Sequence, residues 1–141
     1  MSDLRTIADR VEIDALRAEF SDAVLTRDFD RLASLFAEHD GTVRMPHIDV
    51  VFTGREQIRA GVARLQALWD VFVQHSHPGA LQIDGDTASG RTYMTEQMHG
   101  RPGSNRNYGI YHDRYRRTPE GWRFAERVYE ARWVDPAPPA G

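Results

Sequence analysis

The hydrophobic period of the sequence changes once, at about residue 70, and this change restricts the possible folds most strongly. Before it, apolar residues such as Ile13, Leu16, Phe20 and Val24 recur at three- and four-residue spacing, which predicts amphipathic helices. After it, four strand-like segments are separated by turn residues. Helices followed by strands predict an α+β fold, in which three N-terminal helices pack on a curved antiparallel sheet.

The expected element boundaries follow from these stripes and turns. Capping-box-like pairs, Thr6 with Asp9 and Thr53 with Glu56, mark the starts of the first and third helices. The expected elements, in chain order, are a helix up to the break at 27–28, a short helix at 29–36, short strands at 42–45 and 49–52, a helix with apolar residues from 58 to 69, and long strands at 71–83, 87–98, 106–117 and 122–134. The segment 100–105 is expected to be a longer, mobile loop.

Length and composition restrict the class of protein further. The 141 residues suit a single domain, expected at 1–134, with a flexible Pro-rich tail at 135–141. A net charge of −3 gives no general basic field, so we expect no nucleic-acid partner. The chain has no Cys, and therefore no thiolate nucleophile or Cys-ligated metal. No apolar run is long enough to cross a membrane and no signal peptide is evident, so we predict a cytoplasmic protein without a membrane partner.

Short motifs, in a fixed order over about 130 residues, carry a resemblance to a known family. They are DFDRL at 28–32, TGREQI at 53–58, VQH at 73–75, IDGDTA at 83–88 and GWRF at 121–124. With them the chain resembles the SnoaL-like branch of the nuclear transport factor 2-like superfamily. The stretch WRFA at 122–125 and the later Arg132 and Trp133 make it most similar to the scytalone dehydratase-like group. The resemblance implies a cone-shaped α+β barrel, a deep hydrophobic pocket and a homodimer.

The family includes dehydratases, isomerases, polyketide cyclases and epoxide hydrolases, so the resemblance also implies a range of activities. We expect a cofactor-independent acid–base enzyme of the dehydratase, isomerase or cyclase type. Its ligand would be a hydrophobic, oxygenated small molecule, polyketide- or steroid-like, bound in the pocket. The alternative is a non-catalytic protein that binds such a molecule in the same pocket.

His75 is the first candidate for the proton carrier. Imidazole titrates near neutral pH and can exchange a proton with a carbon acid or a hydroxyl. By resemblance, the dehydratase group has a pocket histidine at this place on its first long strand, although a bulge would present His77 instead. His75 and His77 also stand at the spacing of a metal pair on one strand face, but no third and fourth ligand follow at a suitable distance. We therefore predict neither a metal nor a cofactor.

The next strand offers two faces, and the sequence alone does not show which one is buried. Tyr93, Gln97 and His99 lie on one face, and Glu96 lies on the other between Met94 and Met98. The resemblance places a second catalytic histidine near residues 97–99, so His99 is a catalytic candidate and Tyr93 and Gln97 are candidate substrate contacts. Glu96 is the alternative proton carrier if its face is the inner one.

The remaining candidates lie on the third long strand and the first helix. By resemblance, Gly109 and Tyr111 occupy pocket positions, and the phenol of Tyr111 can donate a hydrogen bond to a developing enolate. The helix pair Tyr-Asp of the dehydratase group is replaced here by Val24 and Leu25, which favours the binding-protein alternative and leaves Asp22 as a weak catalytic candidate. The expected apolar pocket lining is Phe20, Val24, Leu25, Met45, Trp69 and Phe72.

Overall fold

The computed structural model describes residues 3–136 and contains three α-helices, one short 3-10 helix and a six-stranded sheet. The elements are α1 (Leu4–Thr26), α2 (Phe29–Ser34), β1 (Thr42–Met45), η1 (Pro46–Ile48), β2 (Val50–Thr53), α3 (Arg55–Gln66), β3 (Trp69–Asp84), β4 (Thr87–Gly100), β5 (Gly103–Thr118) and β6 (Gly121–Pro136). The strand order is β2-β1-β6-β5-β4-β3, so the α+β class and the segregation of helices and strands are confirmed.

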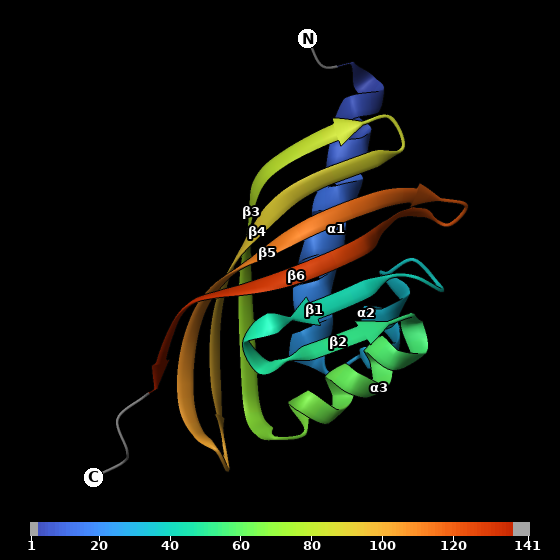
Figure 1. The fold of residues 1–141 in the computed structure, drawn as a ribbon. Helices are drawn as coiled ribbons and strands as arrows, with labels where there is room; N and C mark the ends of the chain where they lie inside the picture. The colour runs from blue at the N-terminus through green and yellow to red at the C-terminus, as the bar shows by residue number, and fades with distance from the viewer. Residues whose placement is uncertain (1–2, 137–141) are drawn as a thin grey trace.

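The sheet is curved and unclosed, and α1 runs across its concave face (Figure 1). Four of its five strand pairs are antiparallel, but β1 pairs with β6 in parallel, with Val43 opposite Arg127. This pair corrects the expectation of an all-antiparallel sheet. The parallel β1–β6 pair continues a direction that is set just after α2. There, Phe36 forms a parallel bridge to Phe124 of β6, and the chain then enters β1 beside the same strand. Helices α2 and α3 pack on each other, and α3 also contacts β2.

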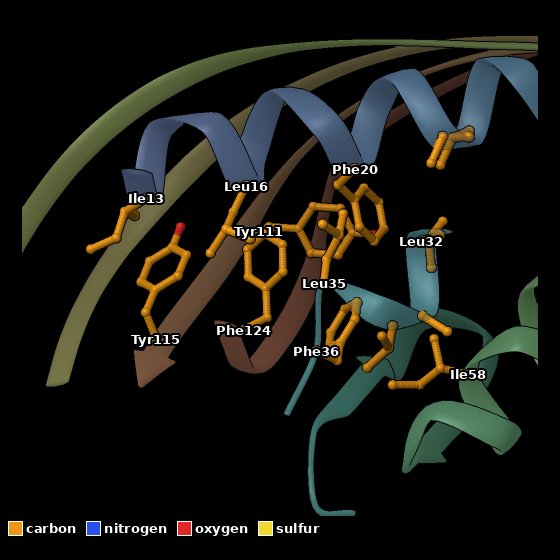
Figure 2. Packing of buried hydrophobic residues seen from close by; sticks show 14 of the residues in the cluster. Ile13, Leu16, Phe20, Leu32, Leu35, Phe36, Ile58, Tyr111, Tyr115 and Phe124 are labelled. Atoms are coloured by element: carbon orange, nitrogen blue, oxygen red, sulfur yellow. The ribbon is translucent and has the colours of Figure 1, made fainter. Parts of the chain in front are cut away.

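Helix α1 is held by its ends and by one buried face. Asp3 accepts a hydrogen bond from the backbone N–H of Thr6, so the cap lies three residues before the expected one. The helix ends at Thr26 and is capped by Arg27, which has a left-handed backbone with φ 56°. Figure 2 shows its apolar face, with Ile13 and Phe20 pointing toward the aromatic side chains of the sheet. These contacts form the main core and fix α1 on the concave face.

Several expected boundaries differ from the structure. The segment 100–105 is not a long loop, because only residues 101–102 lie between β4 and β5 and the two strands pair as far as Gly100 and Gly103. The third helix ends at Gln66, and Trp69 begins β3. Of the expected tail 135–141, the structure places residues 135–136 in β6, while 137–141 lie outside the described residues. Within the described part of the chain, no helix is both long and apolar enough to cross a membrane.

Candidate functional site

A cavity of about 460 Å³ lies between the concave face of the sheet, the C-terminal half of α1, α3 and the β1–η1–β2 segment. Its walls are mostly apolar, with Phe20 and Val24 from α1, Met45 from β1, and Trp69 and Phe72 from β3. All five are among the residues expected in the pocket. The size and the apolar walls suit a hydrophobic ligand of drug-like size.

The polar groups of the cavity gather around the carboxyl group of Glu96 on β4. The side chain is 6% exposed, and the hydroxyl of Tyr129 on β6 donates to its Oε1 at 2.6 Å. The amide Nε2 of Gln74 on β3 donates to its Oε2 at 2.9 Å. The side chain of Asn107 on β5 also acts to lower the pKa of Glu96. Side chains from three neighbouring strands thus act on the same carboxyl group.

A second hydrogen bond fixes the orientation of Gln74. The hydroxyl of Ser21 on α1 lies 3.1 Å from the Gln74 Oε1 atom and donates to it. Because Oε1 is an acceptor, the Nε2 end of the amide must face Glu96. Ser21 and Gln74 are both buried, so this arrangement connects α1 to the carboxyl group through two polar side chains.

The environment of Glu96 favours a protonated carboxyl group. Burial raises the pKa of Glu96, and the hydrogen bonds from Tyr129 and Gln74, together with the Asn107 side chain, oppose this rise without cancelling it. Burial and the neighbouring Glu96 raise the pKa of Tyr129. A buried carboxyl group whose pKa moves toward the working pH can both take up and release a proton, which general acid–base catalysis requires.

His47 is a second titratable group at this cavity. It belongs to η1 and its ring lies against that of Tyr129, with centroids 5.2 Å apart. Burial lowers the pKa of His47, so the imidazole is neutral at neutral pH and can accept a proton. The His47 residue is exposed, which places the ring where the cavity meets the surface.

Tyr111 and Gly109 lie on the inner face of β5. Tyr111 lines the cavity and packs edge-on against Phe20 and Tyr129. Burial raises the pKa of Tyr111, so its hydroxyl remains a hydrogen-bond donor. Gly109 is buried but does not line the cavity, because the ring of Tyr129 covers it: a Cβ there would come within 2.3 Å of that ring. The role of Gly109 is therefore structural. Because it has no side chain, it leaves room for the ring of Tyr129, whose hydroxyl donates to Glu96.

Four predicted residues lie on the opposite face of the sheet from the cavity. His75, Tyr93, Gln97 and His99 are exposed, and the ring of His99 contacts Ser104 beside the β4–β5 turn. The reason is the register: on β4, and on β3 between its two register shifts, the even-numbered side chains point inward, with Gln74 paired opposite Glu96. The prediction that His75 and His99 face the pocket is therefore wrong, and His77 is exposed as well.

The two remaining candidates on α1 also point away from the cavity. Asp22 is exposed and forms an ion pair with Arg31 at 2.6 Å. Leu25 is 54% exposed, whereas its neighbour Val24 lines the cavity. One residue along a helix corresponds to about 100° of rotation, so Val24 and Leu25 cannot face the same way.

Sequence reasoning weighed Glu96 only as an alternative and did not find Gln74, Tyr129, Asn107 or His47. The available signal was the position of Glu96 between two methionines on one strand face, a pattern typical of an inner face. Within residues 3–136 there is no group of three or more His, Cys, Asp or Glu side chains placed to hold a metal ion.

A curved sheet wrapped around a long helix (Figure 1) is the α+β fold of the nuclear transport factor 2-like class, which solved neighbours share. Residues 5–128 match the SnoaL-like domain, and the chain belongs to this family. An uncharacterized protein of Mycobacterium tuberculosis is 28% identical over 131 residues, which cover 91% of this chain and 88% of the relative.

Two solved structures show the same fold. The hexachlorocyclohexane dehydrochlorinase LinA-type3 from Novosphingobium barchaimii has a TM-score of 0.89 and 21% identity, covering 99% of this chain and 97% of its own. A proposed scytalone dehydratase from Novosphingobium aromaticivorans has a TM-score of 0.80 and 18% identity, covering 96% and 91%. At these identities the likeness establishes the fold, and the chemistry must be argued from the residues of this chain.

Proposed function

We propose that this protein is a cofactor-independent enzyme that performs acid–base chemistry on a hydrophobic, oxygenated small molecule, polyketide- or steroid-like, bound in the cavity. The observation that carries the proposal is the buried carboxyl group of Glu96 in a mostly apolar cavity, where burial raises its pKa. Glu96 takes the role first assigned to His75. Tyr111 serves as the donor that orients a substrate oxygen.

The structural neighbours favour elimination among the possible reactions. A dehydrochlorinase and a dehydratase both remove a hydrogen and a leaving group from adjacent carbons. In a dehydration here, the Glu96 carboxylate removes the proton from carbon, and the C–H electron pair forms the new double bond as the C–O bond breaks. The same carboxyl group returns the proton to the departing oxygen, which leaves as water.

A comparison of three proteins tests this proposal. Wild type, Glu96→Gln and His75→Ala are incubated with a panel of steroid, naphthol-type and linear polyketide-like compounds, followed by chromatography and mass spectrometry. We expect loss of water, or a product of equal mass, with wild type and His75→Ala but not with Glu96→Gln. His75→Ala is the matched control because it removes a titratable side chain from the outer face of the neighbouring strand. Unchanged turnover in Glu96→Gln would contradict the proposal.

The second candidate function is non-catalytic binding of the same class of molecule. It is favoured by the inner positions of β3 and α1, which present Gln74 and Ser21 rather than titratable groups. It is also favoured by the carboxyl group of Glu96, whose acceptors are already engaged by neighbouring donors. Compounds that are retained unchanged by all three proteins would support this function.

A further inference from the structure

The mouth of the cavity is marked by those of its lining residues that are exposed. Ile48, Leu68 and Val134 are apolar and 45–55% exposed, and His47 is exposed beside them. Among the described residues that line the cavity, every other polar side chain belongs to a buried or half-buried residue. A ligand that fills the cavity therefore meets His47 as the polar side chain at the surface.

The turn that carries His47 fixes the backbone of this residue. The 3-10 helix η1 lies between β1 and β2, which pair as far as Met45 and Val50. Pro46 occupies its first position, and the N–H of Asp49 donates to the Pro46 carbonyl at 3.2 Å. Asp49 has a left-handed backbone with φ 56°. In a residue other than glycine, this conformation persists where the surrounding structure imposes it, and such positions cluster at ligand sites.

The imidazole ring of His47 lies against the cavity wall and has free hydrogen-bonding groups. Its centroid is 5.2 Å from that of Tyr129, whose hydroxyl donates to Glu96. Burial alone lowers the pKa of His47, and no hydrogen bond or charge from residues 3–136 contributes to this shift. The neutral ring thus offers one N–H donor and one acceptor nitrogen to a ligand at the mouth.

The polar groups deeper in the cavity have other partners or places. Gln74 and Tyr129 both donate to Glu96, and Tyr111 is the donor assigned to the oxygen at the reacting carbon. Asn105 is half-buried near the β4–β5 turn. None of the described residues that line the cavity is Arg or Lys, so a ligand carboxylate would find no cation to pair with. The groups at the mouth therefore suit an uncharged oxygen.

We propose that His47 is a substrate-binding residue, which holds a hydroxyl or carbonyl oxygen of the ligand at the mouth while the reacting carbon lies beside Glu96. The ligand is then an uncharged apolar molecule with oxygens at two ends. This assignment rests on the proposed function, because it concerns the same cavity, but its test measures binding alone.

Three steroids and three proteins test the assignment. The steroids are 17β-estradiol, which has a hydroxyl at each end, and 3-deoxyestradiol and 17-deoxyestradiol, each of which lacks one of them. Equilibrium dialysis measures the Kd of each steroid for wild type, His47→Phe and His39→Phe. Phenylalanine keeps a flat ring beside Tyr129 and removes both nitrogens. His39→Phe is the matched control, because the His39 side chain is 89% exposed and does not line the cavity.

Each missing hydroxyl should weaken binding to wild type by about three- to tenfold, the usual effect of an uncharged hydrogen bond. In His47→Phe one of the two losses should disappear, because the hydroxyl at that end no longer has a partner. The steroid without this hydroxyl should bind His47→Phe at least as tightly as wild type, which shows that the cavity is intact. His39→Phe should behave like wild type. The inference is overturned if His47→Phe keeps both losses, if His39→Phe also removes one, or if none of the steroids binds.

The inference and the proposed function can fail independently. Glu96→Gln removes the proton carrier and retains His47, so it should lose turnover and keep the loss of affinity that depends on His47. Turnover that survives in Glu96→Gln contradicts the catalytic proposal, whereas two losses that survive in His47→Phe contradict the assignment of His47.

Discussion

Asp113 and Arg127 form an ion pair in the interior of the protein, and we predict that Asp113→Asn is strongly destabilising. The Arg127 Nε lies 2.7 Å from Asp113 Oδ1 and its Nη2 3.1 Å from Oδ2, and neither side chain has any exposed surface. Thr92 and Tyr115 donate to the same Oδ2 at 2.7 and 2.8 Å. The pair joins β5 to β6 behind the cavity wall.

The expected loss follows from the burial of both charges. Asn keeps the shape of Asp113 but leaves the guanidinium of Arg127 without a carboxylate, and the buried Arg17 lies near the same cluster through Tyr115. Removing one partner of a buried pair costs about 3–5 kcal/mol of the free energy of unfolding. For a chain of this length, that loss corresponds to a decrease in Tm of roughly 10 °C or more.

The matched control lies one residue further along the same strand. Arg114 pairs with Glu126 of β6 at 3.1 Å on the outer face of the sheet, and its side chain is 66% exposed. Arg114→Gln should therefore cost less than about 1 kcal/mol. The assay is urea unfolding followed by circular dichroism, and similar midpoints for Asp113→Asn and Arg114→Gln would refute the reasoning. Replacing the pair together, as Asp113→Leu with Arg127→Met, should recover most of the loss.

Three further predictions concern the site and the surface. Gly109→Ala should destabilise the protein by about 1–3 kcal/mol and weaken ligand binding, since the added Cβ would press on the Tyr129 ring; thermal melting and dialysis measure the two effects. Folding raises the pKa of Glu96, so its contribution to stability is present below the ordinary value of 4.5 and is lost as the pH rises through the raised value. The Tm of Glu96→Gln should therefore rise relative to the Tm of wild type as the pH increases from 4.5. We also propose a homodimer through the outer sheet face, where Trp133 stacks on Tyr108 at 5.2 Å; light scattering should give twice 16.1 kDa for wild type and a smaller mass for Trp133→Glu.

The order of elements could be read from the sequence because each one has a local cause. The stripe of Ile13, Leu16 and Phe20 is long enough to define α1, and all three residues are buried in the structure. The turns at Gly85 and Gly121 adopt positive φ values of 61° and 105°, which favour glycine, so the hairpins that they close are marked in the sequence. The parallel pairing of β1 with β6 has no such local signal, because its partners are more than 80 residues apart.

The inner face of the long strands could not be read in the same way. Both faces of β4 carry residues that suit a pocket, with Tyr93 on one and Glu96 on the other. A shift of one residue exchanges the two faces completely, and on β4 the local signal was limited to the two methionines that flank Glu96. The choice is made by α1, which covers the concave face and leaves Met94, Glu96 and Met98 buried.

The position of the acid explains why the resemblance pointed to the right fold and the wrong residue. The dehydratase-like pattern assigns proton transfer to a histidine on the first long strand, and the inner position there is Gln74, which cannot titrate. Gln74 instead donates to Glu96 across the β3–β4 pair, oriented by Ser21 from α1. The three strands and the helix that frame the cavity thus all support a single carboxyl group on β4. Any acid–base chemistry that uses this polar cluster must therefore depend on Glu96, whichever oxygenated ligand the cavity binds.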